Sequence, residues 1–173
     1  MMAAADLERE LAAAAALARD PRCAGALAHL RIDEATWGLG YVEIHGQLYE
    51  PTETGEPAFI VSHEIGSELL DLVCCRLADR FMASRLGQAG VLGEGWIIVA
   101  RRYGVALPLF HDALQWAHGG FVGATVVDWK QARSALSGAP SITCASAQLA
   151  QRVHDAFTVP VDLPALAYVR KAA

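Results

Sequence analysis

Four residues have side chains and positions that could support chemistry: Cys144, Asp128, His63 and Glu64. Cys144 is expected at the end of a strand directly before a helix, where a helix N-terminus lowers a thiol pKa and so favours the nucleophilic thiolate. A phosphatase-like or arsenate-reductase-like site would also need an arginine about six residues later, and that position is Ala150. The competing interpretation of Cys144 is a small buried hydrophobe.

Asp128 is expected at the carboxyl end of a strand, the edge of an open α/β sheet at which ligands bind. It could therefore contact a metal or a substrate hydroxyl. The spacing of Asp128 and Gln131 also matches a variant of the capping box, which satisfies free N–H groups at a helix start. This second interpretation, a helix cap before Trp129, is the one that the pattern favours.

His63 and Glu64 could form a general acid/base cluster with His45, because imidazole titrates near neutral pH. The segment begins like a metalloprotease helix, but Ser67 stands where the second histidine ligand would be. Cys74 and Cys75 would point to opposite faces of a strand and could not hold one ion together. We therefore predict no metal site and no cofactor.

Glycines recur at positions 87, 90, 93 and 95, which could suggest a phosphate-binding loop. Such loops follow a strand and open a helix, and in ATPases they end in Lys followed by Ser or Thr. The sequence does not indicate that context here. Turn-forming glycines between structural elements are the favoured interpretation, and a nucleotide-binding module with degenerate phosphate contacts remains an alternative.

The first half of the chain predicts helices followed by a small antiparallel β-meander. Apolar residues from Leu7 to Ala18 recur at helical spacing, and a second helix is expected from Pro21 through Leu30. Residues 41 to 49 alternate as a strand, and residues 58 to 61 form a second strand in a hairpin with it. Residues 63 to 86 fit either one long helix or a turn near 65 to 67, a third strand from 69 to 75, and a short helix from 78 to 85; the second is preferred.

The second half predicts a βαβαβα unit with a partly parallel sheet. Residues 96 to 103 fit a strand or a helix closed by Gly104, and the helix is favoured. Strands are then expected at 105 to 109, 121 to 127 and 140 to 144, with helices at 110 to 118, 129 to 137 and from Ser146 onward. The fold class is therefore mixed α/β. We expect one domain over residues 1 to 173, with a sub-boundary at 87 to 95 between residues 1 to 86 and 96 to 173.

A run of residues in the C-terminal half resembles a pattern in uncharacterised bacterial proteins of prophage and mobile-element settings. The resemblance is carried by Val105, Pro108, Leu109, Asp112, Ala113, Leu114, Trp116, Gly119, Gly120, Val126, Val127, Asp128 and Trp129. Most of these are core and cap residues. The resemblance implies a bacterial, mobile-element-associated protein, but it implies no activity and no functional residue.

The composition limits the partners that the chain could have. Hydrophobic residues make up 54% and charged residues 19% of the 173 residues, which is typical of a folded and self-associating protein. The net charge of −5 disfavours nucleic acid. No apolar run reaches the length of a membrane span, and the N-terminus lacks the pattern of an export signal. We expect a cytoplasmic protein whose four cysteines are reduced.

The leading functional hypothesis is a non-enzymatic binding or regulatory accessory protein that acts through a protein interface. It rests on aromatic residues that cannot all be buried: Trp37, Tyr41, Tyr49, Trp96, Tyr103, Trp116 and Trp129. The alternative is a small hydrolase or transferase with Cys144 or Asp128 at the carboxyl edge of the C-terminal sheet. We also expect a homodimer or larger assembly, with the strand at 41 to 49 as an available edge.

Overall fold

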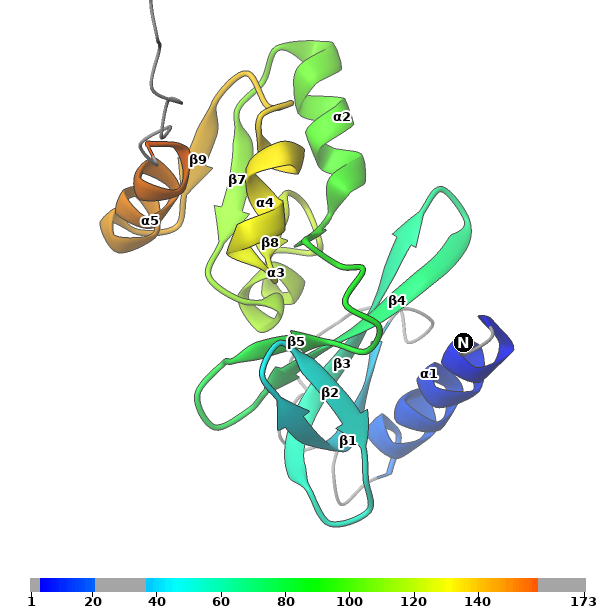
Figure 1. The fold of residues 1–173 in the computed structure, drawn as a ribbon. Helices are drawn as coiled ribbons and strands as arrows, with labels where there is room; N and C mark the ends of the chain where they lie inside the picture. Colours follow the sequence, from blue (N-terminus) through cyan, green and yellow to red (C-terminus); the bar gives the residue numbers. More distant parts are fainter. Residues whose placement is uncertain (1–3, 21–36, 159–173) are drawn as a thin grey trace, which may run out of the picture.

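The computed structural model describes residues 4–20 and 37–158 as a mixed α/β fold. An N-terminal helix precedes a barrel of five strands, and a βαβαβα unit follows (Figure 1). In chain order the elements are α1 (Ala4–Ala18), β1 (Trp37–His45), β2 (Leu48–Pro51), β3 (Glu56–Ile65), β4 (Glu68–Arg76), β5 (Met82–Ser84), β6 (Val91–Leu92), α2 (Glu94–Tyr103), β7 (Leu107–Phe110), α3 (Ala113–His118), β8 (Ala124–Val126), α4 (Trp129–Leu136), β9 (Ile142–Cys144) and α5 (Ala147–Phe157). The first predicted helix is confirmed, and the one predicted from Pro21 to Leu30 lies outside the described residues.

The strands of the first half close into a barrel in the order β1-β2-β5-β4-β3, so the predicted antiparallel meander is part of a closed barrel and not a separate sheet. The antiparallel pairs β1–β3 and β3–β4 are those of the predicted meander. Closure comes from β5, which pairs antiparallel with β4 and parallel with β2 through Leu48 and Ser84. Within β1, residues Trp37–Val42 pair with β3 and residues Val42–His45 pair with β2, so each edge of the strand is paired over only part of its length.

Two predictions about elements of the barrel are wrong, because the structure has a turn within each predicted element. The strand expected from 41 to 49 is divided by a two-residue turn at Gly46 and Gln47, and Gly46 has a φ of 67° that a glycine adopts without strain. The helix expected from 78 to 85 is instead a turn followed by β5. Asp79 holds this turn by accepting a hydrogen bond from the Phe81 N–H at 3.1 Å and by pairing with Arg76.

Helix α1 is fixed to the barrel by a partly buried polar contact as well as by apolar packing. The Tyr49 hydroxyl donates to Glu10 at 2.9 Å, and the Arg85 guanidinium donates to the other Glu10 oxygen at 3.1 Å. Burial and the neighbouring Glu10 carboxylate raise the pKa of Tyr49 well above its ordinary value. Glu10 therefore links the helix to both β2 and the residue that follows β5.

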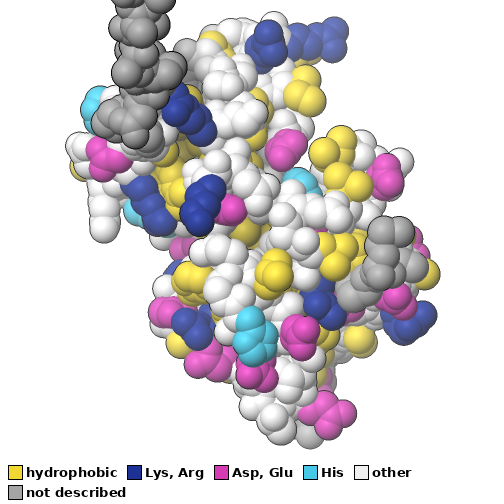
Figure 2. All heavy atoms as spheres, in the orientation of Figure 1, with side chains coloured by type: hydrophobic (Ala, Val, Ile, Leu, Met, Phe, Trp, Pro, Cys, Tyr) yellow, Lys and Arg dark blue, Asp and Glu magenta, His cyan; other side chains and the backbone are white. Residues whose placement is uncertain are grey.

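The second half forms a four-stranded sheet in the order β6-β8-β7-β9, in which β7 is parallel to both neighbours and β6 is antiparallel to β8. The helix from 96 to 103 is confirmed, including its left-handed cap at Gly104. Helices α2, α4 and α5 share one core with the sheet, whereas α3 contacts the barrel strand β3. In Figure 2, Lys and Arg side chains gather over the upper end of α2 and over α4 and α5. No helix within the described ranges is long and apolar enough to cross a membrane.

The barrel and the α/β unit meet in a shared apolar cluster. Phe59, Val61 and Val73 of the barrel belong to the same buried cluster as Leu114 and Trp116 of α3. The odd-numbered residues of β3 therefore face the α/β unit, and its even-numbered residues face the core that contains α1. This alternation follows from the period of two in a strand.

The segment that connects the two halves is held by Asp71 of β4, whose side chain is fully buried. One carboxylate oxygen accepts the N–H groups of Leu72 and Leu86, both at 2.8 Å. The other accepts the Ser84 hydroxyl at 3.0 Å and the N–H groups of Gln88 and Ala89 at 2.8 and 3.2 Å. Five donors thus converge on one buried charge, which makes Asp71 the anchor of the connection.

Replacing Asp71 by Asn is expected to lower the free energy of unfolding by about 3 kcal/mol or more. The NH₂ group of asparagine would replace one carboxylate oxygen, and it cannot accept the hydrogen bonds of the two or more donors that face this oxygen. Urea unfolding followed by tryptophan fluorescence measures this change. The control is Asp155→Asn on the exposed surface of α5, for which a change within about 0.5 kcal/mol is expected. Equal stability of the two variants would show that Asp71 is not an anchor.

Candidate functional site

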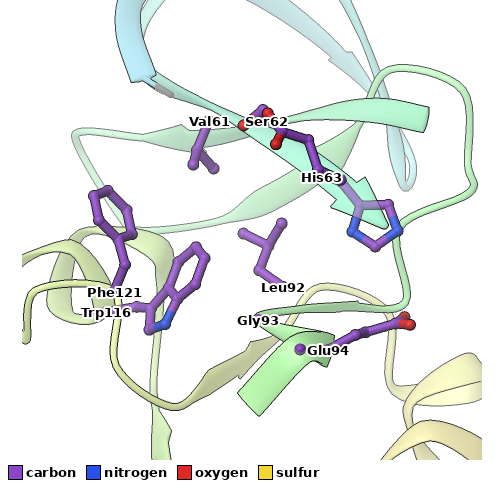
Figure 3. Close-up of a pocket in the computed structure, with 10 residues that line it drawn as sticks. Val61, Ser62, His63, Leu92, Gly93, Glu94, Trp116 and Phe121 are labelled. Atoms are coloured by element: carbon purple, nitrogen blue, oxygen red, sulfur yellow. The ribbon is translucent and has the colours of Figure 1, made fainter. Parts of the chain in front are cut away.

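A cleft of about 220 Å³ lies where the end of β3 meets the α/β unit (Figure 3). The barrel contributes Val61, Ser62, His63 and Glu64, and the α/β unit contributes residues 92–95, Trp116 and Phe121. In Figure 3 the rings of Trp116 and Phe121 lie at one end, His63 and Glu94 lie at the other, and Leu92 lies between them. The cleft therefore has an aromatic end and a polar end.

His63 is placed in this cleft by the alternation of β3. It follows Phe59 and Val61 on the face directed at the α/β unit, and it stands opposite Asp71 in the register with β4. Only 3% of its surface is exposed, and among the described residues no group forms a hydrogen bond with its ring. Within the described part of the chain the Trp37 indole N–H is the one fully buried side-chain polar group without a partner, so the ring nitrogens of His63 open to the cleft and can pair with a ligand there.

Glu64 and His45 do not form the predicted cluster with His63. A β-bulge interrupts the register between His63 and Glu64, and the Glu64 side chain is exposed at the rim of the cleft. His45 lies at the opposite end of β1 from the Trp37–Val61 pair and has Glu43 as its neighbour at 3.7 Å. The prediction that His45, His63 and Glu64 form an acid/base cluster is therefore wrong, although His63 itself lies in the cleft.

The polar end of the cleft contains the N-terminus of α2. Gly93 lies between β6 and α2 and has a φ of 83°, so the segment does follow a strand and open a helix, contrary to the sequence prediction. No side chain caps this helix. Because the first N–H groups of an α-helix lack acceptors within the helix, those of Glu94 and Gly95 are donors at the cleft.

The aromatic end is built by a strained turn that the sequence interpretation missed. Phe121 has a φ of 59°, which is rare for a bulky residue, and its ring meets that of Trp116 edge to face at 4.8 Å. The Trp116 indole is fixed by a hydrogen bond of 3.0 Å to the Gly123 carbonyl. The glycines at 119, 120 and 123 could have indicated this turn in the sequence, because they flank the aromatic residue Phe121.

Asp128 lies outside this cleft, at the carboxyl edge of the second sheet. It caps α4 by accepting the Lys130 N–H at 2.9 Å, so the cap interpretation is confirmed. Gln131 donates to the Asp128 carboxylate at 3.0 Å rather than returning to its backbone. Asp128 also lines a larger hollow of about 420 Å³ whose positive charges come from Arg80, Lys130 and Arg152.

The side chains at this carboxyl edge already have partners in the protein. Arg152 lies over the Trp129 ring at 4.6 Å, and the His111 ring pairs with the Ser146 hydroxyl at 2.7 Å. Ser146 is in turn the cap of α5. The N-termini of α3, α4 and α5 are all capped by side chains, unlike the N-terminus of α2.

The cysteines of the described residues have environments that oppose a nucleophilic role. Cys144 ends β9 as predicted, but burial raises the pKa of its thiol above the ordinary value. Burial raises the pKa of both Cys74 and Cys75 to about 12. Within residues 4–20 and 37–158 the structure contains no group of His, Cys, Asp and Glu that could hold a metal ion.

Replacing Asp128 by Ala is expected to destabilise the protein by about 1 kcal/mol, because the first turn of α4 loses its cap. Asp128→Ser is the matched control, since serine caps helices about as well as aspartate does. Thermal unfolding of both variants checks the difference. Equal losses in the two variants would contradict the capping role.

Alkylation should be slow at Cys144 and slower still at Cys74 and Cys75, because their raised pKa values leave little thiolate at neutral pH. Iodoacetamide labelling of the folded protein, with peptide mass spectrometry, measures each site against free glutathione. The Cys144 rate should still be rising at a pH where the glutathione rate has levelled off. A Cys144 rate above that of glutathione at pH 7 would restore the thiolate hypothesis.

Comparisons with protein-family models, with curated proteins and with solved structures find no match for this chain.

Proposed function

We propose that the protein is a non-enzymatic binding protein, with a regulatory or accessory role, that acts through the outer face of α2. The observation that carries this proposal is the exposure of Ile98 and Val99, at 69% and 36% of their surfaces. Trp96 and Tyr103, which flank this face on the same helix, are also exposed. A surface helix normally directs polar residues to solvent, and a group of exposed apolar side chains marks an interaction surface.

This face is separate from the side of α2 that stabilises the fold. Ile97 and Ala100 are buried against β7, β8 and α4 in the core of the α/β unit. With 3.6 residues per turn, Gly95, Ile98, Val99 and Arg102 lie on the opposite side of the helix. The apolar character of Ile98 and Val99 is therefore not explained by packing against the residues that the structure describes.

The occupant that we propose for the face is a second copy of the chain, packed with its α2 antiparallel to the first. Glu94 lies in the first turn of α2, and Arg101 and Arg102 lie in the last. An antiparallel twofold pair brings the acidic end of each helix to the basic end of the other, with Ile98 and Val99 at the centre. In Figure 2 hydrophobic side chains lie over α2 between basic side chains at its upper end and an acidic one lower down.

The strand at 41 to 49, the other surface predicted for association, supports an interface less well. Tyr49 is fully buried in the barrel, and β1 is paired with β3 over Trp37–Val42 and with β2 over Val42–His45. Tyr41 is exposed, as are Trp96 and Tyr103, so the expectation that not all aromatic residues are buried is confirmed. The exposed apolar residues of α2 remain as the basis for an interface.

We expect a concentration-dependent dimer with a dissociation constant on the order of 10 µM, because one short helix pair provides a small interface. Sedimentation velocity over a range of concentrations measures this constant. Ile98→Glu should weaken the dimer by about tenfold or more, because two carboxylates would be buried at its centre. The matched control is Ile65→Glu in the exposed β3–β4 hairpin, where 54% of the isoleucine surface is accessible.

A second pair of variants tests the antiparallel arrangement. Arg101→Glu together with Arg102→Glu should weaken the dimer, and adding Glu94→Arg should restore it, because the reversed charges again face each other. A strict monomer at about 100 µM would overturn the proposal. So would a dimer that Ile98→Glu leaves intact.

A further inference from the structure

The cleft beside α2 combines features that call for a ligand rather than for packing. His63 is buried and its ring has no hydrogen-bond partner among the described residues. The N-terminus of the ten-residue helix α2 opens into the same space without a side-chain cap. Figure 3 shows the His63 ring above the side chain of Glu94, the first residue of this helix, so both features lie at the polar end.

We propose that this cleft binds a small carboxylic acid with an apolar, ring-bearing body. The carboxylate would accept hydrogen bonds from the first N–H groups of α2 and from a ring N–H of His63. The body would lie on Leu92 and against the rings of Trp116 and Phe121 at the other end. This assignment does not depend on the proposed role of the outer face of α2.

The size and the charges of the cleft narrow the class of ligand. A volume of about 220 Å³ admits a small molecule, and it is too small for a nucleotide. Glu64 and Glu94 at the rim oppose a multiply charged phosphate. A lone inorganic anion would also leave the aromatic end uncovered.

An amine is the competing ligand, since the same two carboxylates would attract it. The exposed Glu64 side chain is hydrated, however, which weakens its attraction. An ammonium group only donates, so it would leave the N–H groups of α2 without an acceptor. A carboxylate satisfies these donors, and the proposal therefore favours an acid over an amine.

The test uses phenylacetate as the probe, with benzylamine and acetate as controls, on the whole protein. Titrations followed by ¹H–¹⁵N NMR should show saturable shifts of the Gly93 and Gly95 amides and of the Trp116 indole, with a dissociation constant of about 1 mM or lower. Benzylamine should bind at least about tenfold more weakly, because it lacks the acceptor. Acetate should also bind at least about tenfold more weakly, because it lacks the ring.

Two variants assign the effect to the polar end. His63→Phe keeps an apolar ring in the buried position but removes the N–H, and it should weaken phenylacetate binding about tenfold. Glu94→Gln removes a repelling charge, so it should tighten phenylacetate binding about threefold and weaken that of benzylamine. Glu68→Gln in the exposed β3–β4 hairpin is the matched control and should change neither.

Three results would overturn the assignment: no shifts up to about 20 mM phenylacetate, tighter binding of benzylamine than of phenylacetate, or weaker phenylacetate binding in Glu94→Gln. The last variant does not depend on whether His63→Phe folds. Ile98→Glu should leave the phenylacetate affinity unchanged, and Glu68→Gln should leave the dimer unchanged. Because Glu94 also faces the partner in the proposed dimer, Glu94→Gln is compared with Glu94 in the Ile98→Glu background, so that the failure of this proposal can be told apart from the failure of the dimer.

Discussion

The buried Asp71 carboxylate determines how the two halves of the chain are joined. A charge without access to water is tolerated only when donors surround it, and here one hydroxyl and four backbone N–H groups do so. Three of these donors belong to residues 86–89, which leave the barrel. At the far end of this segment the Gly90 carbonyl accepts the N–H groups of Val127 and Asp128. The connection is thus bonded to both halves.

The connection between the two halves also determines where the candidate sites lie. Asp71 pairs in register with His63, so the strand pair that holds the connection also presents the imidazole to the α/β unit. The connection continues through β6 into α2, which brings the uncapped helix start to the same cleft. The two sides of α2 have different environments: Ile97 packs into the core of the α/β unit, and Ile98 is exposed.

The sequence predicted those helices and strands that are specified by residues close together in the chain. Helices α2 and α4 were found from a terminal glycine or a capping side chain, and α5 from apolar residues at a spacing of four; each of these signals acts within about one turn. Barrel closure was not predictable in this way, because it depends on a parallel contact between Leu48 and Ser84. His63 was identified as a candidate, but its neighbours Trp116 and Phe121 are more than 50 residues away in the sequence, and only the shared core brings them together.

Amide hydrogen exchange at the connection tests the central claim most directly. If Asp71 anchors this segment, the N–H groups of Leu86, Gln88 and Ala89 should exchange only through global unfolding, as slowly as the amides of Val73 and Cys74 in β4. The Gly66 amide in the exposed hairpin turn should exchange quickly and serves as the internal reference. Exchange of residues 86–89 at the rate of Gly66 would show that the two halves are not held together by Asp71.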